Sequence, residues 1–448
     1  MENKELCLPS HSEIKEHSLN ALQCYWPYKT ELIAQLPILE NKIEILAGVP
    51  LKLVSVRLPD WAECCGVDGC ILVPIESVPA DYVGPEADLW REVDWFLAVF
   101  LLIECWHERL WENKFGPIHS YSFRLKGWDK RAWQYAWVNR IGLFLREWAA
   151  DLENDTAESR FGPLPITKIH MTHDVDAISK TWAIRIKQSG FFFFNAIRAT
   201  CQGDIRVAAE RLGKAFIFFF GRKNWMVFDI LLAEEKQAEI TGTFHFYADL
   251  RPKSTKRWLL DPGYKVDSVI VRRLLTKLIK SKHEIGLHPG FESWDNPEAL
   301  LAQKKSLEAA SGVTISSVRQ HWLRFSWAKT WASQESVGLT LDTTLMFNDK
   351  PGFRNASLLC WHPWNSVSGE PFTMQALPSM LMDSHFYDYL QLNDIERKEE
   401  MSLWIKECMA VSGEVAVLWH PHTLSNDYGW SSGFSQLLKL IKFSGRKS

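Results

Sequence analysis

Two aspartates stand two positions apart in the segment Ile-His-Met-Thr-His-Asp-Val-Asp at 169–176. The β-type residues before them predict a strand, and side chains two apart on a strand share one face. The carboxylates of Asp174 and Asp176 would then lie side by side, which is costly unless a cation neutralises them or one carries a proton. The pair indicates a metal or acid–base site, with a capped turn as the structural alternative.

Three later segments end in the same way, in polar side chains after a short apolar run. They place His288 after Glu-Ile-Gly-Leu, Arg319 and His321 after Ser-Val, and His420 and His422 after Val-Ala-Val-Leu-Trp. Period-two spacing predicts a common face for each of the last two pairs. A neutral imidazole is a good zinc ligand, and Arg319 suits a carboxylate such as Asp174. Because buried charged groups need partners, this recurrence favours one shared site.

The elements that must position these residues alternate between two types from residue 166 onward. Strand-like runs cover 166–172, 241–247, 284–287, 317–323, 339–341, 375–378 and 415–419, and helical patterns cover 266–281, 297–310, 326–336 and 394–412. Strands separated by helices predict an α/β fold with a parallel sheet, closed or partly closed as a barrel. Function gathers at the carboxyl ends of such strands, so the polar residues are expected to meet there.

The length of 448 residues is enough for two domains. Residues 1–152, with strand-like runs followed by helical ones, are predicted to form a smaller α/β domain whose role the sequence does not indicate. Residues 165–448 are predicted to form the catalytic domain, with a helical insertion at about 178–238. The tryptophans of the first 150 residues recur at helical spacings, which favours packed helices.

Bulk properties exclude several classes of partner. The net charge is −3, so no basic field of the kind found in nucleic-acid binders is expected. The longest apolar run, Trp95–Trp106, contains Glu104 and is shorter than the roughly 20 residues needed to cross a bilayer, so no membrane span is expected. The first residues lack a secretory signal and the nine cysteines are scattered, which predicts a cytoplasmic protein.

At these residues the sequence resembles the polysaccharide deacetylases of carbohydrate esterase family 4, including the nodulation-type deacetylases. Thr-His-Asp-Val-Asp (172–176) is similar to that family's Thr-Phe-Asp-Asp motif, Thr-Gly-Thr-Phe-His-Phe (241–246) to its Thr-Phe-Phe strand, and His-Glu-Ile-Gly-Leu-His (283–288) to its Gly-His-Glu-Ile-Gly-Asn-His. Arg319 matches the arginine motif, Asp342 the aspartate after it, and Leu-Trp-His (418–420) the terminal Leu-His. The likeness covers about 165–425, and the N-terminal extension resembles that of uncharacterised bacterial members. It implies a distorted (β/α) barrel that uses a divalent metal to hydrolyse acetyl groups.

The resemblance also implies a set of metal ligands, with two departures from the family pattern. Val175 separates the two aspartates, and Glu292 stands where the family has its second metal histidine. Asp176 and His288 are the implied ligands, and the third is His321 or Glu292. We prefer His321, because its position on the predicted strand points it inward.

The remaining roles follow from the same resemblance. Asp174 is expected to be the general base, Arg319 to orient it, and His420 to be the general acid. Candidates of second rank for orienting a histidine or contacting the sugar are Asp342, Arg354 and Asp383. The predicted activity is removal of N- or O-linked acetyl groups from a carbohydrate, in surface polysaccharide metabolism, with zinc as the favoured metal.

Two alternatives stay open at this point. The missing second histidine and the abundance of tryptophan are also typical of a catalytically weakened relative that binds glycans. A hydrolase of C–N amide bonds outside sugars is the other alternative, since related barrels cleave such bonds. The sequence does not indicate the oligomeric state.

Overall fold

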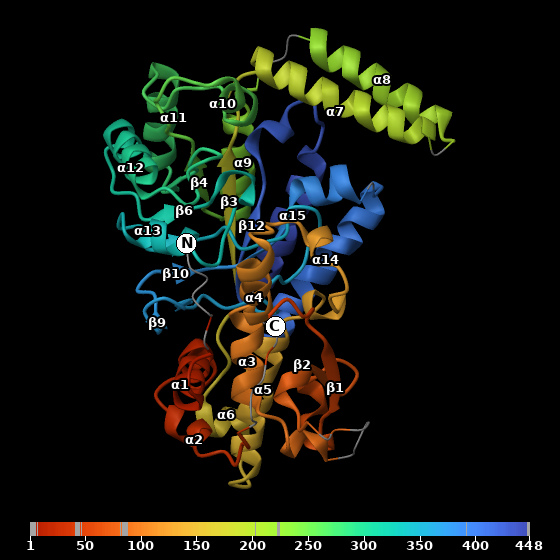
Figure 1. The fold of residues 1–448 in the computed structure, drawn as a ribbon. Coiled ribbons are helices and arrows are strands. Elements are labelled where there is room, and N and C mark those ends of the chain that lie inside the picture. Colours follow the sequence, from red (N-terminus) through yellow and green to blue (C-terminus); the bar gives the residue numbers. More distant parts are fainter. Residues whose placement is uncertain are drawn as a thin grey trace. The chain divides into compact units, whose positions relative to one another are not determined.

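The computed structural model describes residues 6, 8–40, 45, 47–80, 82, 88–201, 203–221, 225–390 and 392–445 (Figure 1). Contacts divide the chain into two compact units. Unit 1 comprises Met1–His170, Trp322–Val417 and Leu440–Ser448, and unit 2 comprises Met171–His321 and Leu418–Lys439. The two units are defined by contacts alone. The prediction of separate domains at 1–152 and 165–448 therefore stays a prediction.

One sheet of eight strands has the order β10-β7-β6-β5-β4-β3-β12-β11. In chain order its strands are β3 (Lys168–Val175), β4 (Thr243–Phe246), β5 (Glu284–Leu287), β6 (Ser317–Val318), β7 (Leu341–Asp342), β10 (Gln375–Ala376), β11 (Ser379–Met382) and β12 (Glu414–Leu418). The pairs β3–β4, β4–β5, β5–β6 and β10–β7 are parallel. The predicted fold class, an α/β fold with a parallel sheet of the barrel type, is confirmed.

Unit 2 holds the helices that alternate with β3 to β6. They are α7 (Trp182–Cys201), α8 (Ile205–Phe220), α9 (Phe228–Ala238), α10 (Thr255–Leu260), α11 (Val269–Lys280) and α12 (Pro297–Ser311), and α15 (Ser431–Ser444) begins there. Helix α11 buries Val271, Leu274, Leu275 and Leu278, the spacing of a single apolar face. Helix α12 has Asn296 as its N-cap and a proline at its first position, and together they fix where the helix begins.

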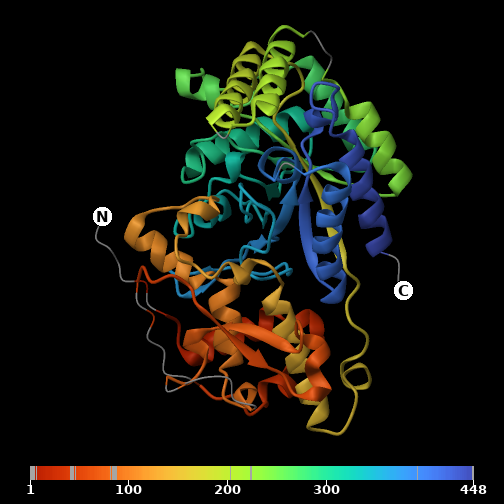
Figure 2. The same cartoon turned by 90° about the vertical axis from the view of Figure 1, so that its right-hand side faces the viewer.

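Unit 1 combines the N-terminal elements with later segments. Its helices are α1 (His11–Ala21), α2 (Thr30–Ala34), α3 (Trp95–Ile103), α4 (Trp106–Phe115), α5 (Trp137–Asp151), α6 (Ala157–Phe161), α13 (Thr330–Glu335) and α14 (Asp394–Ala410). The hairpin of β1 (Leu53–Arg57) and β2 (Cys70–Pro74) packs against α3 and α5 (Figure 2). A second small ribbon pairs β8 (Trp364–Asn365) with β9 (Glu370–Pro371). Most of the N-terminal tryptophans are buried in this core, as their spacing predicted.

A buried acidic side chain ties two distant segments of unit 1 together. Glu104, between α3 and α4, forms ion pairs with His17 and Arg109. It also accepts hydrogen bonds from the indole N–H of Trp361 at 2.8 Å and the backbone N–H of Trp364 at 3.0 Å. Burial would raise the pKa of Glu104, but Arg109 and His17 outweigh burial and lower it.

The helices of the described part of the chain include none that is both long and apolar enough to cross a membrane.

Candidate metal centre and active site

The carboxyl ends of three strands of unit 2 lie in register at one edge of the sheet. Asp174 of β3 pairs with His245 of β4, which pairs in turn with Gly286 of β5. His288 follows β5 directly, and the backbone N–H of Arg319, just after β6, donates to β5 at 3.0 Å. Polar residues that are far apart in the sequence therefore meet at this edge.

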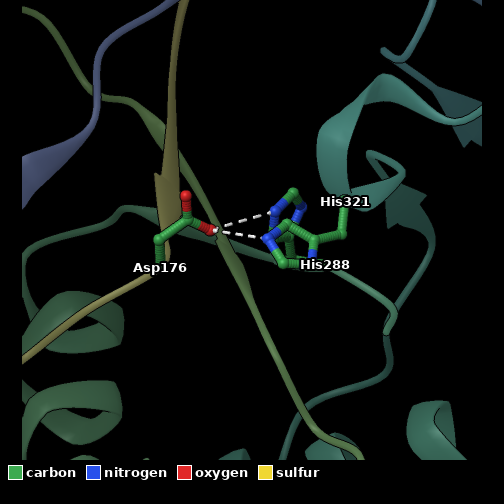
Figure 3. A group of neighbouring side chains, drawn as sticks. All are labelled: Asp176, His288 and His321. Carbon is green, nitrogen blue, oxygen red and sulfur yellow. Dashed lines mark ion pairs between the residues drawn. The ribbon is translucent and has the colours of Figure 1, made fainter. Parts of the chain in front are cut away.

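Asp176, His288 and His321 form a cluster of three side chains that could hold a metal ion (Figure 3). Each offers one ligand atom, and these atoms all lie within 4.8 Å of one another. Nε2 of His288 is 3.2 Å from Oδ1 of Asp176, and Nε2 of His321 is 3.7 Å from the same oxygen. Both imidazoles are buried, whereas the Asp176 side chain is 29% exposed. The aspartate is thus the one partly exposed member of the cluster, although its Oδ1 is buried.

The second nitrogen of each imidazole faces a group that can only accept a hydrogen bond. Nδ1–H of His288 donates to the carbonyl oxygen of Arg319 at 2.7 Å. Nδ1 of His321 lies 3.6 Å from Oδ1 of Asp261. With a proton on Nδ1, each ring turns the lone pair of Nε2 toward Asp176, and metal-binding histidines usually have this arrangement.

The charges around Asp176 favour its ionised form. Burial would raise the pKa of its carboxyl, but the contact with His288 and the charges of His321, His288 and His420 hold the pKa well below its usual range. Burial would lower the pKa of His288, yet Asp174 and Asp176 raise it, whereas for His321 burial prevails and lowers the pKa. Among the described residues, none donates a hydrogen bond of good geometry to the buried Oδ1 of Asp176. This oxygen and two imidazole nitrogens fit a divalent cation.

Asp174 lies beside the cluster and is held by an arginine. Nη1 of Arg319 is 3.5 Å from Oδ1 of Asp174, and it donates to Oγ1 of Thr172 at 2.6 Å. Nδ1 of His288 is 3.9 Å from the other carboxylate oxygen. Asp174 and Arg319 are both buried, so water does not screen their interaction. A carboxylate fixed next to a candidate metal site has the placement that a general base needs.

His245 also contacts Asp174; it lies in the motif at 241–246, but the sequence analysis gave it no role. Its Nδ1 is 3.6 Å from Oδ1 of Asp174 and its Nε2 is 3.1 Å from Oγ of Ser317. Burial, with the charge of Arg319, holds the pKa of His245 well below its usual range. Gly286 makes room for the ring, since a Cβ at this position would come within 2.3 Å of Cδ2 of His245. The neutral imidazole thus fills the space between β4 and β5 and supports Asp174.

The two histidines after β12 take different places. Nε2 of His420 is 3.7 Å from Oδ2 of Asp176, so His420 joins the site. His422 stacks on Trp225, with ring centroids 5.5 Å apart and an angle of 19° between the planes. The two rings remain neighbours, with centroids 5.8 Å apart, but strand alternation does not position them, because the strand ends before His420 and a 3₁₀ turn begins at Pro421.

The pair Arg319 and His321 departs from the sequence prediction for a similar reason. The predicted strand 317–323 ends at Val318, and His321–Leu323 form a 3₁₀ turn with positive φ at Trp322 and Leu323. This turn, rather than strand alternation, carries His321 to Asp176 while Arg319 stays beside Asp174.

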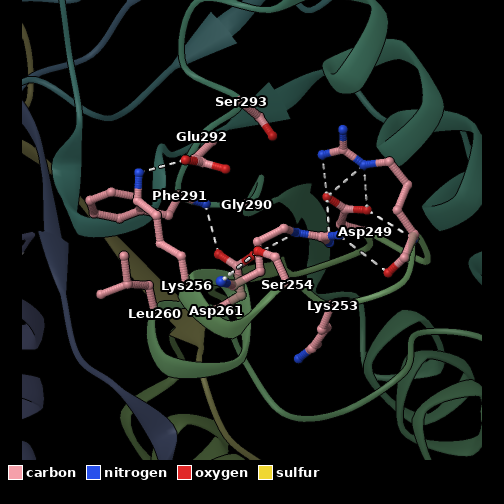
Figure 4. A network of polar contacts seen from close by, with 12 residues as sticks. Asp249, Lys253, Ser254, Lys256, Leu260, Asp261, Gly290, Phe291, Glu292 and Ser293 are labelled. Atoms are coloured by element: carbon pink, nitrogen blue, oxygen red, sulfur yellow. Dashed lines mark hydrogen bonds and ion pairs between the residues drawn. The ribbon is translucent and has the colours of Figure 1, made fainter.

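Glu292, the alternative third ligand, is engaged outside the cluster (Figure 4). Its carboxylate pairs with Nζ of Lys256 at 2.5 Å, and its side chain is 48% exposed. The group of side chains able to share one ion contains His321 and does not contain Glu292.

Asp261 supports His321 and was also missed by the sequence reasoning. It accepts a hydrogen bond from the backbone N–H of Phe291 at 2.8 Å and lies 3.3 Å from Nε of Arg257 (Figure 4). Burial would raise its pKa, but His321, Phe291 and Arg257 lower it to about 2. Asp261 follows α10, 60 residues before His321, where no periodicity or motif marks it.

The candidates of second rank have partners within unit 1. Asp342 accepts hydrogen bonds from the backbone N–H and the hydroxyl of Thr344, at 2.9 and 2.6 Å. Arg354 forms an ion pair with Glu108 at 2.8 Å. Asp383 accepts a hydrogen bond from the next backbone N–H at 2.8 Å. A role for these three residues in orienting a histidine or contacting the sugar stays a prediction.

Comparison of the sequence with protein families finds no family model that matches, and comparison with curated proteins finds no match either. Similar solved structures do exist, and they include proteins described as a polysaccharide deacetylase and as members of carbohydrate esterase family 4.

Three of these structures show how distant the likeness is. A protein from Mycobacterium smegmatis described as a polysaccharide deacetylase is 18% identical, with 62% of this chain and 85% of that chain covered and a TM-score of 0.37. The CE4 domain of a multidomain xylanase from the hindgut metagenome of Trinervitermes trinervoides is 6% identical, with 63% and 86% covered and a TM-score of 0.28. A CE4 family pseudoenzyme from Bacillus anthracis is 12% identical, with 65% and 69% covered and a TM-score of 0.27. An activity for this chain has to be argued from its own side chains.

Proposed function

We propose that the protein is a metal-dependent hydrolase that removes N- or O-linked acetyl groups from a carbohydrate. The observation that carries this proposal is the convergence of Asp176, His288 and His321, with both Nε2 atoms turned to one carboxylate. The pair Asp174–Arg319 lies next to them. Two imidazoles and a carboxylate are a ligand set typical of catalytic zinc, so zinc is the metal we propose.

The chain's own residues supply the proton transfers. A zinc ion held by Asp176, His288 and His321 would polarise the acetyl carbonyl and lower the pKa of water toward about 7. Asp174, fixed by Arg319, accepts a proton from the attacking water. His420, which is partly exposed, donates a proton to the leaving amine or alkoxide.

The choice of substrate rests on the motifs. The order of the segments 172–176, 241–246, 283–288 and 418–420 is that of the polysaccharide deacetylases, and these segments supply the residues that meet at the sheet edge apart from Arg319 and His321. Acetylated sugars of a surface polysaccharide or of its precursors are therefore the substrates to test first.

Acetate release from N-acetylated and O-acetylated oligosaccharides tests the proposal, with zinc content measured in parallel. We expect the zinc-loaded chain to release acetate and Asp174→Asn to keep its zinc but lose about 10²–10⁴-fold in turnover. Glu292→Gln is the matched control, because it removes a nearby carboxylate outside the cluster, and it should keep both zinc and turnover. A chain that binds zinc and glycan but releases no acetate would be the weakened relative. Activity confined to cyclic amides would indicate the other hydrolase class.

A further inference from the structure

Helices α7 and α8 form an antiparallel hairpin in unit 2 that the proposed chemistry does not use (Figures 1 and 2). The two helices pack through a narrow buried stripe formed by Phe192, Ala196 and Ala199 of α7 with Ala215 and Phe218 of α8. Much of the remaining surface of the hairpin is apolar and exposed. Trp182 is 67% exposed, Phe216 66% and Phe220 71%, which is unusual for side chains of this size.

Most of the exposed large apolar residues follow one stripe on each helix. On α7 four of the six are spaced by four, seven and four residues, at Trp182, Ile186, Phe193 and Ile197, whereas Phe191 and Phe194 lie outside the stripe. On α8 four of the five are spaced by seven, four and four, at Ile205, Leu212, Phe216 and Phe220, whereas Ile217 lies outside the stripe. Seen along each helix from its N-terminal end, the exposed stripe is rotated by about 100° from the buried stripe. The rotation has the same direction in both helices. Because the helices are antiparallel, this places both stripes on one face of the hairpin.

The hairpin is also basic, in a chain that is acidic overall. Residues 182–220 contain six basic and two acidic side chains, a net charge of +4, whereas the whole chain carries −3. Arg198 and Arg206 are among the exposed basic residues, and they lie outside the apolar stripes. A face rich in apolar side chains with Lys and Arg around it is typical of helices that lie in a membrane interface.

The base of the hairpin is fixed to the loop after β12. Lys180 forms a buried ion pair with Asp427 at 3.1 Å, and the indole N–H of Trp225 donates to the same carboxylate at 2.8 Å. Phe218 of α8 packs edge-on against Trp225, with ring centroids 5.9 Å apart. The hairpin is therefore joined firmly to the loop that carries His420 and His422.

We propose that the α7–α8 hairpin binds the surface of a membrane containing anionic lipid. The apolar face would enter the interfacial layer and the basic side chains would contact the lipid phosphates. The charged residues within both helices favour a position in the plane of the interface over a transmembrane one. A second copy of the chain is a poorer partner for this face, because two hairpins of charge +4 repel each other. The proposal does not depend on the hydrolase activity.

Sedimentation of the full-length protein with vesicles tests this proposal. One set of vesicles is pure phosphatidylcholine, and the other contains 30% phosphatidylserine. We expect binding to the anionic vesicles that weakens as salt rises, because screening shortens the range of the basic charges. Phe193→Glu combined with Phe216→Glu should reduce the partition coefficient at least tenfold. Ile395→Glu combined with Leu403→Glu, which alters exposed apolar residues of α14, is the control and should bind like the wild type.

Arg198→Gln combined with Arg206→Gln probes the charges separately and leaves the apolar face intact. At about fivefold per basic residue near an anionic surface, we expect a roughly 25-fold loss on phosphatidylserine vesicles. This variant keeps the test decisive if the phenylalanine variant fails to fold by circular dichroism. Wild type that binds neither vesicle would overturn the proposal, as would arginine variants that bind like the wild type. A wild-type dimer without lipid that Phe193→Glu converts to a monomer would show that a second copy covers this face instead.

Discussion

Replacing Asp261 with asparagine should weaken zinc binding although Asp261 is not itself a proposed ligand. Its carboxylate faces Nδ1 of His321 and favours the tautomer whose Nε2 is free to bind metal. The pKa of Asp261 is lowered from 3.8 to about 2, so its surroundings favour the carboxylate by about 2–3 kcal/mol. Of the groups that lower this pKa, His321 has the largest effect. In the variant, the amide of the new asparagine could donate a hydrogen bond to Nδ1 of His321 and shift the ring proton to Nε2. We therefore expect a 10–100-fold loss of affinity, as for other residues that orient metal-binding histidines.

Competition with a fluorescent zinc chelator at pH 7 would measure this loss. Asp249→Asn is the matched control, because Asp249 shares Arg257 with Asp261 and is equally buried, yet no contact joins it to His321 among the described residues. We expect the control to bind zinc within about twofold of wild type. Equal affinity in folded Asp261→Asn and wild type would refute the reasoning. An equal loss in both variants would assign the effect to loop packing around Arg257 instead.

Three further predictions concern other parts of the chain. His288→Ala should abolish zinc binding without unfolding the protein, and a variant that keeps its full zinc content by elemental analysis would disprove its role as a ligand. Gly286→Ala should displace His245, costing about 1–3 kcal/mol in denaturant unfolding and lowering turnover more than zinc content; unchanged kinetics would show that His245 only fills space. Glu104→Gln should destabilise the chain by about 3–5 kcal/mol at pH 7, because it leaves Arg109 buried without its partner. Because the pKa of Glu104 is lowered in the folded state, its ionised carboxylate stabilises the fold above the unfolded pKa near 4.5. The difference in unfolding free energy between variant and wild type should therefore shrink as the pH falls through the folded pKa. A difference that stays constant with pH would contradict this.

The regular part of the fold could be predicted from periodicity. The expected strands at 241–247, 284–287 and 415–419 correspond to β4, β5 and β12, and the expected helix 297–310 corresponds to α12. These segments have one apolar face or are fully buried, so side-chain pattern and structure agree. Strand β11 (Ser379–Met382) was not predicted, because four buried residues give no alternation that would separate it from its neighbours.

The turns that position residues near the site could not be predicted. His321 was named as a ligand and His422 as its counterpart after β12 on the ground of strand alternation, but both lie in 3₁₀ turns that strand periodicity does not predict. Asp261 and His245 act through neighbours brought together only by the fold. Residue types at the ends of strands thus indicated where the site lies, while the groups that orient those residues required coordinates.

The short link between Asp176 and the hairpin has a consequence for how substrate is found. Only five residues separate Asp176 from Trp182, and the buried pair Lys180–Asp427 stiffens this link. A hairpin resting on a bilayer would hold the reaction centre at a fixed height above the lipid headgroups. A saccharide carried on a lipid would then be searched for in two dimensions at high local concentration, whereas a sugar in bulk solution would gain nothing from the attachment.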